Sequence, residues 1–219
     1  MLNFDKFVNE AVVFSNTFNF KELLSLTKFT QREQYCNKFL EKIASGTGRI
    51  VYIFDDKSVI KLAKNEKGIA QNRTEGYYGM KYSSITEVLD SSEDYEYLHV
   101  ERARKCSLKE FKQLMNVDFK SWCAFIWNWN IERKTSNYKF SKREISNENN
   151  DYLNEHLQYR DSFVFNFFDM ILCFSMVSNE FTRISCYGIV NRDGEDCLVV
   201  TDYGLNEDVF DEFYNKKRR

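Results

Sequence analysis

Two short apolar runs on either side of a polar turn constrain the fold of this chain most strongly. The runs are Ile50–Phe54 and Ser58–Leu62, and Asp55-Asp56-Lys57 separates them. Alternation with a period of two is typical of strands, and aspartates are common in turns. We therefore predict a β-hairpin in which Lys61 lies inside an apolar strand. A buried ammonium group requires a partner, so this lysine is the first candidate functional residue.

Helical and strand patterns alternate around this hairpin. Helical spacing is expected from Phe4 to about Leu40, with a break near residues 16–19. Further elements are predicted on both sides of the hairpin: a short strand at Ile43-Ala44, a helix over 66–82, strands over 85–89 and 95–100, helices over 107–114, 119–131 and 163–177, and a final hairpin over 187–202 that turns at Asn191–Gly194. The polar stretch 136–150 is predicted to be a mobile loop.

This order predicts an α+β fold of two lobes. An antiparallel-sheet N-lobe with one main helix would precede a reduced, mainly helical C-lobe. We place an N-terminal helical extension at residues 1–41, the N-lobe at 42–101 and the C-lobe, which ends in the last hairpin, at 102–219.

The composition excludes several classes of function. The chain has 219 residues, with 31 Lys and Arg against 33 Asp and Glu, so its net charge of -2 does not favour nucleic-acid binding. The N-terminus lacks the pattern of a signal peptide, and Asp169 interrupts the most apolar stretch, so no membrane association is expected. The six cysteines form no CxxC pair, which argues against a zinc site and suits the reducing cytoplasm.

Three groups of residues together indicate a nucleotide site. Gly46 and Gly48 lie between two predicted strands, where glycines let backbone amides approach a phosphate. Glu75 follows Lys61 by fourteen residues, on a predicted helix, where its carboxylate could pair with the lysine. Asp202-Tyr203-Gly204 follows an apolar run, and an aspartate at a strand end could hold the Mg²⁺ that bridges nucleotide phosphates. Taken singly, the first and last motifs are also compatible with ordinary turns.

These motifs, in this order, resemble the protein-kinase-like superfamily, and their amino-acid sequence is most similar to that of kinase-like proteins of tailed bacteriophages. The resembling stretches are GTGRIVYIF, SVIKLAKNEKGIAQNRTE, YLHVERARKCSLKEF and SCYGIVNRDGEDCLVVTDYGLNEDVF. The resemblance implies that ATP and Mg²⁺ are cofactors. Gly46 and Gly48 would cover the phosphates, Lys61 and Glu75 would pair, Asp202 would bind metal, and residues 100–103 would form a hinge. In that hinge Glu101, Arg102 and Ala103 would face the adenine, the first two through backbone groups.

The chain departs from the kinase pattern in two places. The catalytic-loop stretch runs from Ser178 to Cys186 and lacks the Asp base, so Glu180 is the candidate catalytic carboxylate and Ser185, five residues later, the candidate second metal ligand. A register shifted by one residue would instead align Phe181 and Cys186, which could do neither task. Only fifteen residues follow Gly204, too few for a peptide-docking segment.

The sequence leaves three functions open. The first is an ATP-binding protein that transfers phosphate, weakly or atypically, to itself, a small molecule or one host protein. The second is an inactive pseudokinase that binds a host or viral protein, with Trp122, Trp127 and Trp129 as a candidate aromatic surface or, alternatively, as core residues. The third is a structural domain in which Lys61 and Glu75 are only a buried pair. The expected location is the cytoplasm, that of the host if the protein is viral.

Overall fold

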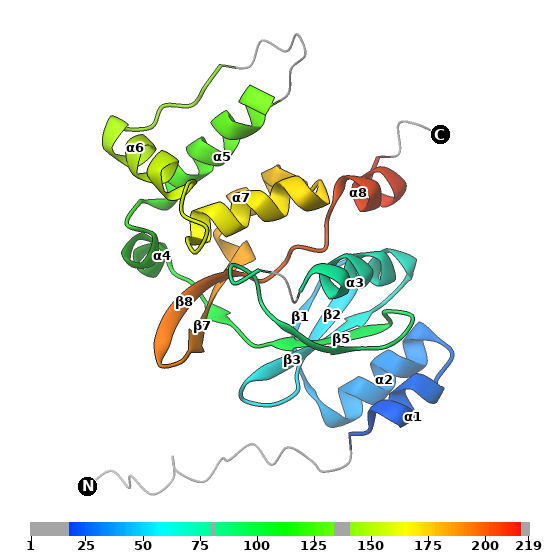
Figure 1. Ribbon diagram of the computed structural model, residues 1–219. Coiled ribbons are helices and arrows are strands. Elements are labelled where there is room, and N and C mark those ends of the chain that lie inside the picture. The colour runs from blue at the N-terminus through cyan, green and yellow to red at the C-terminus, as the bar shows by residue number, and fades with distance from the viewer. Residues whose placement is uncertain (1–17, 80–81, 134–140, 216–219) are drawn as a thin grey trace, which may run out of the picture.

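The N-terminal lobe is built on a five-stranded antiparallel sheet. In this computed structural model, which describes residues 18–79, 82–133 and 141–215, the strand order is β1-β2-β3-β5-β4 (Figure 1). The strands are β1 (Glu41–Ser45), β2 (Arg49–Ile53), β3 (Ser58–Ala63), β4 (Val88–Ser91) and β5 (Tyr97–Glu101). The predicted hairpin is confirmed, with β2 and β3 paired from Arg49–Ala63 to Ile53–Val59.

The alternation in these strands separates the two faces of the sheet. Ile50, Tyr52, Ile60 and Leu62 point to one face and form a core with the two N-terminal helices, α1 (Phe20–Ser25) and α2 (Phe29–Phe39). Helix α3 (Glu66–Tyr78) packs near the other face, next to β3 and β5. Because successive side chains of a strand point to opposite faces, Lys61 lies on the α3 side.

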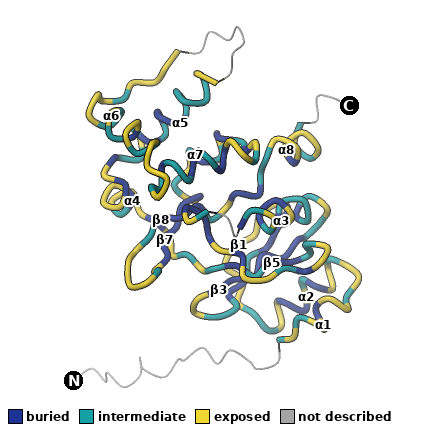
Figure 2. Tube along the Cα trace, in the orientation of Figure 1, coloured by how far each residue is buried: buried dark blue, intermediate teal, exposed yellow. Residues whose placement is uncertain are grey.

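The C-terminal lobe is mainly helical. Its elements are β6 (Arg104–Lys105), α4 (Leu108–Met115), α5 (Phe119–Arg133), α6 (Asn147–His156), α7 (Phe163–Phe174), the 3-10 turns η2 (Ser178–Thr182) and η3 (Ile184–Cys186), β7 (Tyr187–Arg192), β8 (Glu195–Val200) and α8 (Glu207–Phe213). Strands β6, β7 and β8 form a second antiparallel sheet. The core is rich in aromatic side chains, among which Trp122, Phe111 and Phe167 are completely buried. Figure 2 shows buried segments where the helices and strands of each lobe face one another.

The two-lobed α+β architecture expected from the sequence is thereby confirmed. The turn of the last hairpin is also as predicted, because Asp193 and Gly194 both have positive φ, at 54° and 90°. This is the conformation that a two-residue hairpin of the type I′ class requires. Within the described ranges, none of the helices combines the length and the apolar character of a membrane-spanning segment.

Several predicted boundaries were wrong, two for a local reason and one because of a contact with the other lobe. Polar α6 begins at Asn147, inside the stretch predicted to be a loop, because the Ser146 hydroxyl caps it by accepting from the backbone N–H of Asn149. Helix α7 ends at Phe174, three residues early, where Ser175 adopts a left-handed conformation with φ 50°. The strand predicted over 85–89 begins instead at Val88, and Ile85 forms an isolated bridge to Val200 of the other lobe.

Other expectations lie partly outside the described residues. The helix predicted over residues 4–15 lies outside them. The loop predicted over 136–150 is described only from Ser141 onward. The helix predicted over 66–82 is present up to Tyr78, with Gly79 as its C-cap. Helices α1 and α2 cover one face of the sheet, so this part of the N-terminal extension packs as a layer of the N-lobe.

Candidate functional site

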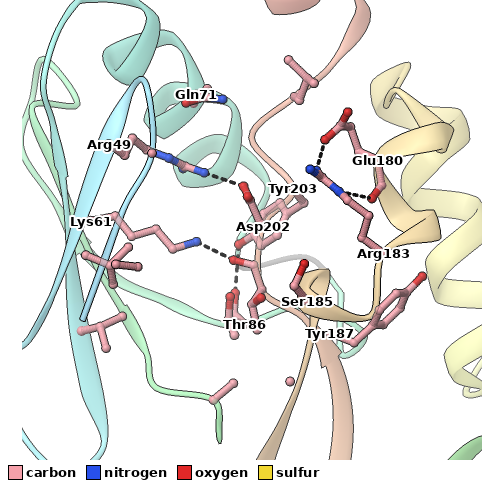
Figure 3. A pocket seen from close by; sticks show the side chains of 18 of the residues that line it. Arg49, Lys61, Gln71, Thr86, Glu180, Arg183, Ser185, Tyr187, Asp202 and Tyr203 are labelled. Atoms are coloured by element: carbon pink, nitrogen blue, oxygen red, sulfur yellow. Dashed lines mark hydrogen bonds and ion pairs between the residues drawn. The ribbon is translucent and has the colours of Figure 1, made fainter. Parts of the chain in front are cut away.

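A cavity of about 620 Å³ lies where the two lobes meet. Its walls come from the glycine turn after β1, the inner face of β2 and β3, the segment after β5, the η2–η3 region and the residues after β8. Of the predicted site residues, it is lined by Gly46, Gly48, Lys61, Glu101, Ala103, Glu180, Ser185 and Asp202. Figure 3 shows side chains from both lobes directed into this space.

Lys61 and Glu75 form the expected ion pair. Register in the sheet places Lys61 between Val51 and Leu98, and its Nζ lies 2.5 Å from Oε2 of Glu75. The ammonium group also donates to the carbonyl of Thr201, at 2.6 Å. The Glu75 side chain is completely buried, so its pairing with Lys61 is shielded from solvent.

A second cation, Arg49, completes this cluster and was missed in the sequence. Its guanidinium contacts Oε1 of Glu75 at 2.8 Å and Oδ1 of Asp202 at 2.6 Å, and its side chain is 9% exposed. Burial acts to lower the pKa of Arg49, but Glu75 and Asp202 outweigh it and raise the pKa, which keeps the group charged. The only sequence signal was an arginine directly after Gly48, and this position alone does not predict a contact with a residue 153 positions away.

Asp202 opens into the cavity beside these cations. Its side chain is 58% exposed and follows β8, as expected. Desolvation acts to raise its pKa, but Arg49, Lys61 and Arg183 together lower the pKa below its ordinary value. The carboxylate is therefore ionised at neutral pH. The next residue, Tyr203, is buried, and its hydroxyl donates to the carbonyl of Thr86 at 2.9 Å.

The donor set does not by itself make a metal site. Among the residues that the structure describes, no three His, Cys, Asp or Glu side chains are grouped to hold a metal ion. Of the predicted ligands, Asp202 shares Oδ1 with the Arg49 guanidinium, and Ser185 offers only a hydroxyl. Mg²⁺ prefers oxygen ligands that include one or two carboxylates, together with water and phosphate. Arg49 holds one of the two oxygens of Asp202, so a metal ion bound there would share this carboxylate with the guanidinium.

The glycine turn is attached to the N-terminus of α3. Gly46 donates its N–H to the carbonyl of Arg49 at 2.8 Å, and the carbonyl of Gly48 accepts from Lys64 at 2.8 Å. A Cβ built on Gly68 would lie only 2.0 Å from the Gly48 oxygen, so Gly68 is needed for this close approach. Lys67 additionally donates to the Thr47 hydroxyl at 2.6 Å. The turn lines the cavity, and packing against α3 gives Gly48 a structural role that the sequence did not reveal.

The hinge residues line the cavity, but two of their backbone donors are already engaged. The N–H of Glu101 donates to the carbonyl of Glu87 at 2.9 Å, and that of Arg102 to Lys57 at 2.7 Å. Of the backbone groups expected to face an adenine, the N–H groups of Glu101 and Arg102 are therefore engaged by neighbouring chain segments. The Glu101 carboxylate is likewise occupied, by Arg192 at 2.6 Å.

The catalytic-loop stretch places Glu180 and Ser185 on the cavity wall. The Glu180 carboxylate is paired with the Arg183 guanidinium, and Figure 3 shows these two side chains directed toward each other. Phe181 and Cys186, the residues of the shifted register, are almost completely buried. A buried hydrogen-bonded chain supports this loop, because Trp122 donates to the Tyr187 hydroxyl and Tyr187 donates to the Phe181 carbonyl, each at 2.8 Å.

Comparisons with known proteins gave no family assignment. No protein-family model matches the chain, and no curated protein matches it. Among solved structures, the streptomycin–ATP complex of APH(2″)-IIa is 14% identical, with a TM-score of 0.32, over 82% of this chain and 71% of that one.

Two further solved structures are similar to the same degree. The GDP complex of aminoglycoside 2′-phosphotransferase-IIIa is 10% identical, with a TM-score of 0.35, over 82% of this chain and 73% of that one. ADP-bound APH(2″)-Ib is 13% identical, with a TM-score of 0.30, over 78% of this chain and 69% of that one.

Proposed function

We propose that this chain is an ATP-binding protein of kinase-like architecture, in which phosphoryl transfer is weak. The observation that carries the proposal is the cluster of Lys61, Glu75 and Asp202 at a cavity between a sheet lobe and a helical lobe. A cavity of about 620 Å³ has the size of a small-molecule site. Lysine held by a carboxylate beside such a cavity is suited to bind phosphate oxygens.

Phosphoryl transfer should be weak because the carboxylate that would act as base, Glu180, is held in an ion pair. Glu180 is engaged by Arg183, and the chain lacks an aspartate at this position. A longer side chain held in an ion pair is poorly placed to accept a proton, and a misplacement of about 1 Å can reduce a rate on the order of a hundredfold. The acceptor that we propose is the protein itself, a small molecule or one host protein.

The second candidate is a pseudokinase that recognises a protein partner. The observation that favours it is that arginines pair with both carboxylates that chemistry would require, Arg183 with Glu180 and Arg49 with Asp202. The aromatic surface is smaller than expected, because Trp122 is fully buried in the core, whereas Trp127 and Trp129 are only half-buried. Relationship to bacteriophage proteins, and action in a host cytoplasm, stay predictions of the sequence resemblance.

Nucleotide binding is tested first, by thermal unfolding and calorimetry of the purified chain with millimolar ATP. A ligand at about one hundred times its Kd stabilises a native state by about 2.7 kcal/mol, so we expect a clear rise in Tm. Lys61→Ala should abolish this rise, because it removes a cation at the phosphate position. Lys142→Ala is the matched control, since Lys142 also pairs with a glutamate, Glu132, but at the exposed surface. Absence of an ATP effect on the wild-type chain would contradict the proposal.

A further inference from the structure

The position of Arg49 gives the cavity a permanent cation where a metal ion is expected. Arg49 belongs to β2 of the N-lobe, and its Nη2 lies 2.6 Å from Oδ1 of Asp202 in the C-lobe. Its Nη1 contacts Glu75. Figure 3 shows the guanidinium directed across the cavity toward Asp202. A Mg²⁺ ion bound through Asp202 would therefore share its carboxylate with a buried positive charge.

The charges around Asp202 explain why a second cation there is unfavourable. Arg49 and Lys61 carry two positive charges, and Glu75 and Asp202 two negative charges, so these four groups are already balanced. Before ATP binds, a dication at Asp202 would leave an excess of two positive charges beside a guanidinium that is 9% exposed, and when the negatively charged phosphates enter, Arg49 already supplies a positive charge at this position. Repulsion between charges a few ångströms apart is strong where water is largely excluded.

Arg49 also retains the hydrogen-bonding capacity to contact phosphate. A guanidinium carries five N–H donors, and its planar arrangement matches the oxygens of phosphate in pairs. Its Nη1 contacts Glu75 and, at 3.4 Å, Oδ1 of Asn72, and its Nη2 contacts Asp202, which leaves Nε and one hydrogen of Nη2 on a residue that lines the cavity. Arg183 supplies another cation on the opposite wall. The site therefore presents three positive side chains toward the space where phosphates would lie.

We propose that Arg49 is the resident phosphate-neutralising cation of this site and that ATP binds without requiring a divalent metal. The inference rests on the proposed nucleotide binding and specifies how that binding is achieved. Arg49 and a metal ion compete for Asp202, so removal of the guanidinium converts the site to one in which Mg²⁺ assists binding.

The test is calorimetric titration of the chain with ATP in excess EDTA and again in millimolar Mg²⁺. For the wild-type chain we expect the two Kd values to agree within about threefold. For Arg49→Gln we expect a Kd raised about tenfold or more in EDTA, equivalent to a loss of about 1.4 kcal/mol, with recovery in Mg²⁺ because Asp202 is then free. Arg32→Gln is the control, since Arg32 is a buried arginine paired with Glu96 in the N-lobe, outside the cavity. It should lower Tm without changing the Kd in EDTA.

The outcomes separate this inference from the proposed function. Wild-type binding that is lost in EDTA and present in Mg²⁺ would overturn the role of Arg49 but leave nucleotide binding intact. Binding by Arg49→Gln in EDTA equal to that of the wild type would also overturn it. No binding by the wild-type chain in either solution would overturn both proposals. The wild-type comparison needs no variant, so the test holds even if Arg49→Gln does not fold.

Discussion

At the scale of single residues, the chemistry of this protein depends on which carboxylates are free. Glu75 is buried between Lys61 and Arg49, and Asp202 is held by Arg49. Glu180 is the remaining acidic group with a predicted catalytic role, and it is paired with Arg183 at the cavity wall. A proton transfer by Glu180 at this site would have to use the oxygen that Arg183 does not hold, or break the pair.

Labelling with ATP tests whether Glu180 takes part in phosphoryl transfer. We expect slow incorporation of label into the protein itself, detectable by mass spectrometry, and a further loss of about tenfold or more in Glu180→Gln, because general-base catalysis contributes about 10² to 10⁴ in rate. Glu132→Gln, at an exposed carboxylate of the C-lobe, is the matched control and should leave the rate unchanged. Rapid turnover of generic peptides would contradict the weak-transfer proposal, and equal labelling by Glu180→Gln would remove this residue from the mechanism.

At the scale of elements, buried side chains joined by hydrogen bonds hold the loop that carries Glu180. Tyr187 at the start of β7 accepts from Trp122 on α5 and donates to the carbonyl of Phe181 in η2. All three residues are almost completely buried. Tryptophan at position 122 thus serves the fold, which favours the core interpretation over a surface for partners.

Tyr187→Phe tests this support. The substitution leaves the Trp122 N–H and the Phe181 carbonyl without their partner, and an unsatisfied buried polar group costs about 1–3 kcal/mol. We expect the free energy of unfolding, measured by urea denaturation, to fall by about that amount. Tyr159→Phe is the control, because the Tyr159 hydroxyl bonds Glu155 at the exposed surface. Equal stability of the two variants would show that the buried chain does not hold the loop.

At the scale of the whole molecule, a few polar contacts join the two lobes around the cavity. Arg49 bonds Asp202, Lys61 bonds the carbonyl of Thr201, and Tyr203 bonds the carbonyl of Thr86. Arg192 also bonds the Glu101 carboxylate and the carbonyls of Ser83 and Ile85. The relative placement of the lobes therefore depends in part on the ionisation of Asp202.

Acid should weaken the contribution of Asp202 to stability. Its pKa is lowered in the folded protein from the ordinary 3.8, so folding favours the charged form. Such a group contributes stability above its unfolded pKa, and this contribution disappears as the pH falls through the lower folded value. We expect Asp202→Asn to lower Tm at pH 7 and the difference in Tm from the wild type to shrink as the pH falls below 3.8. A difference in Tm that stays constant as the pH is lowered further would contradict the prediction.

Local patterns in the sequence were sufficient for much of the fold and for part of the site. Alternation in residues 50–62 determined the hairpin and the inward side of Lys61, because side-chain direction in a strand follows from a period of two. The Asp-Gly turn of the last hairpin also depends on neighbouring residues alone. The pairing of Lys61 with Glu75 followed from the order of a strand and a helix.

Other features were decided only by tertiary structure, because they join segments far apart in the chain. Arg49 meets Asp202 across 153 positions, and no local pattern carries that information. The close approach of Gly48 and Gly68 depends on how α3 packs against the glycine turn. The loss of the hinge N–H groups to Glu87 and Lys57 has the same origin. A sequence thus specifies which side chains an element presents, whereas packing between elements decides which charges meet and which donors stay free.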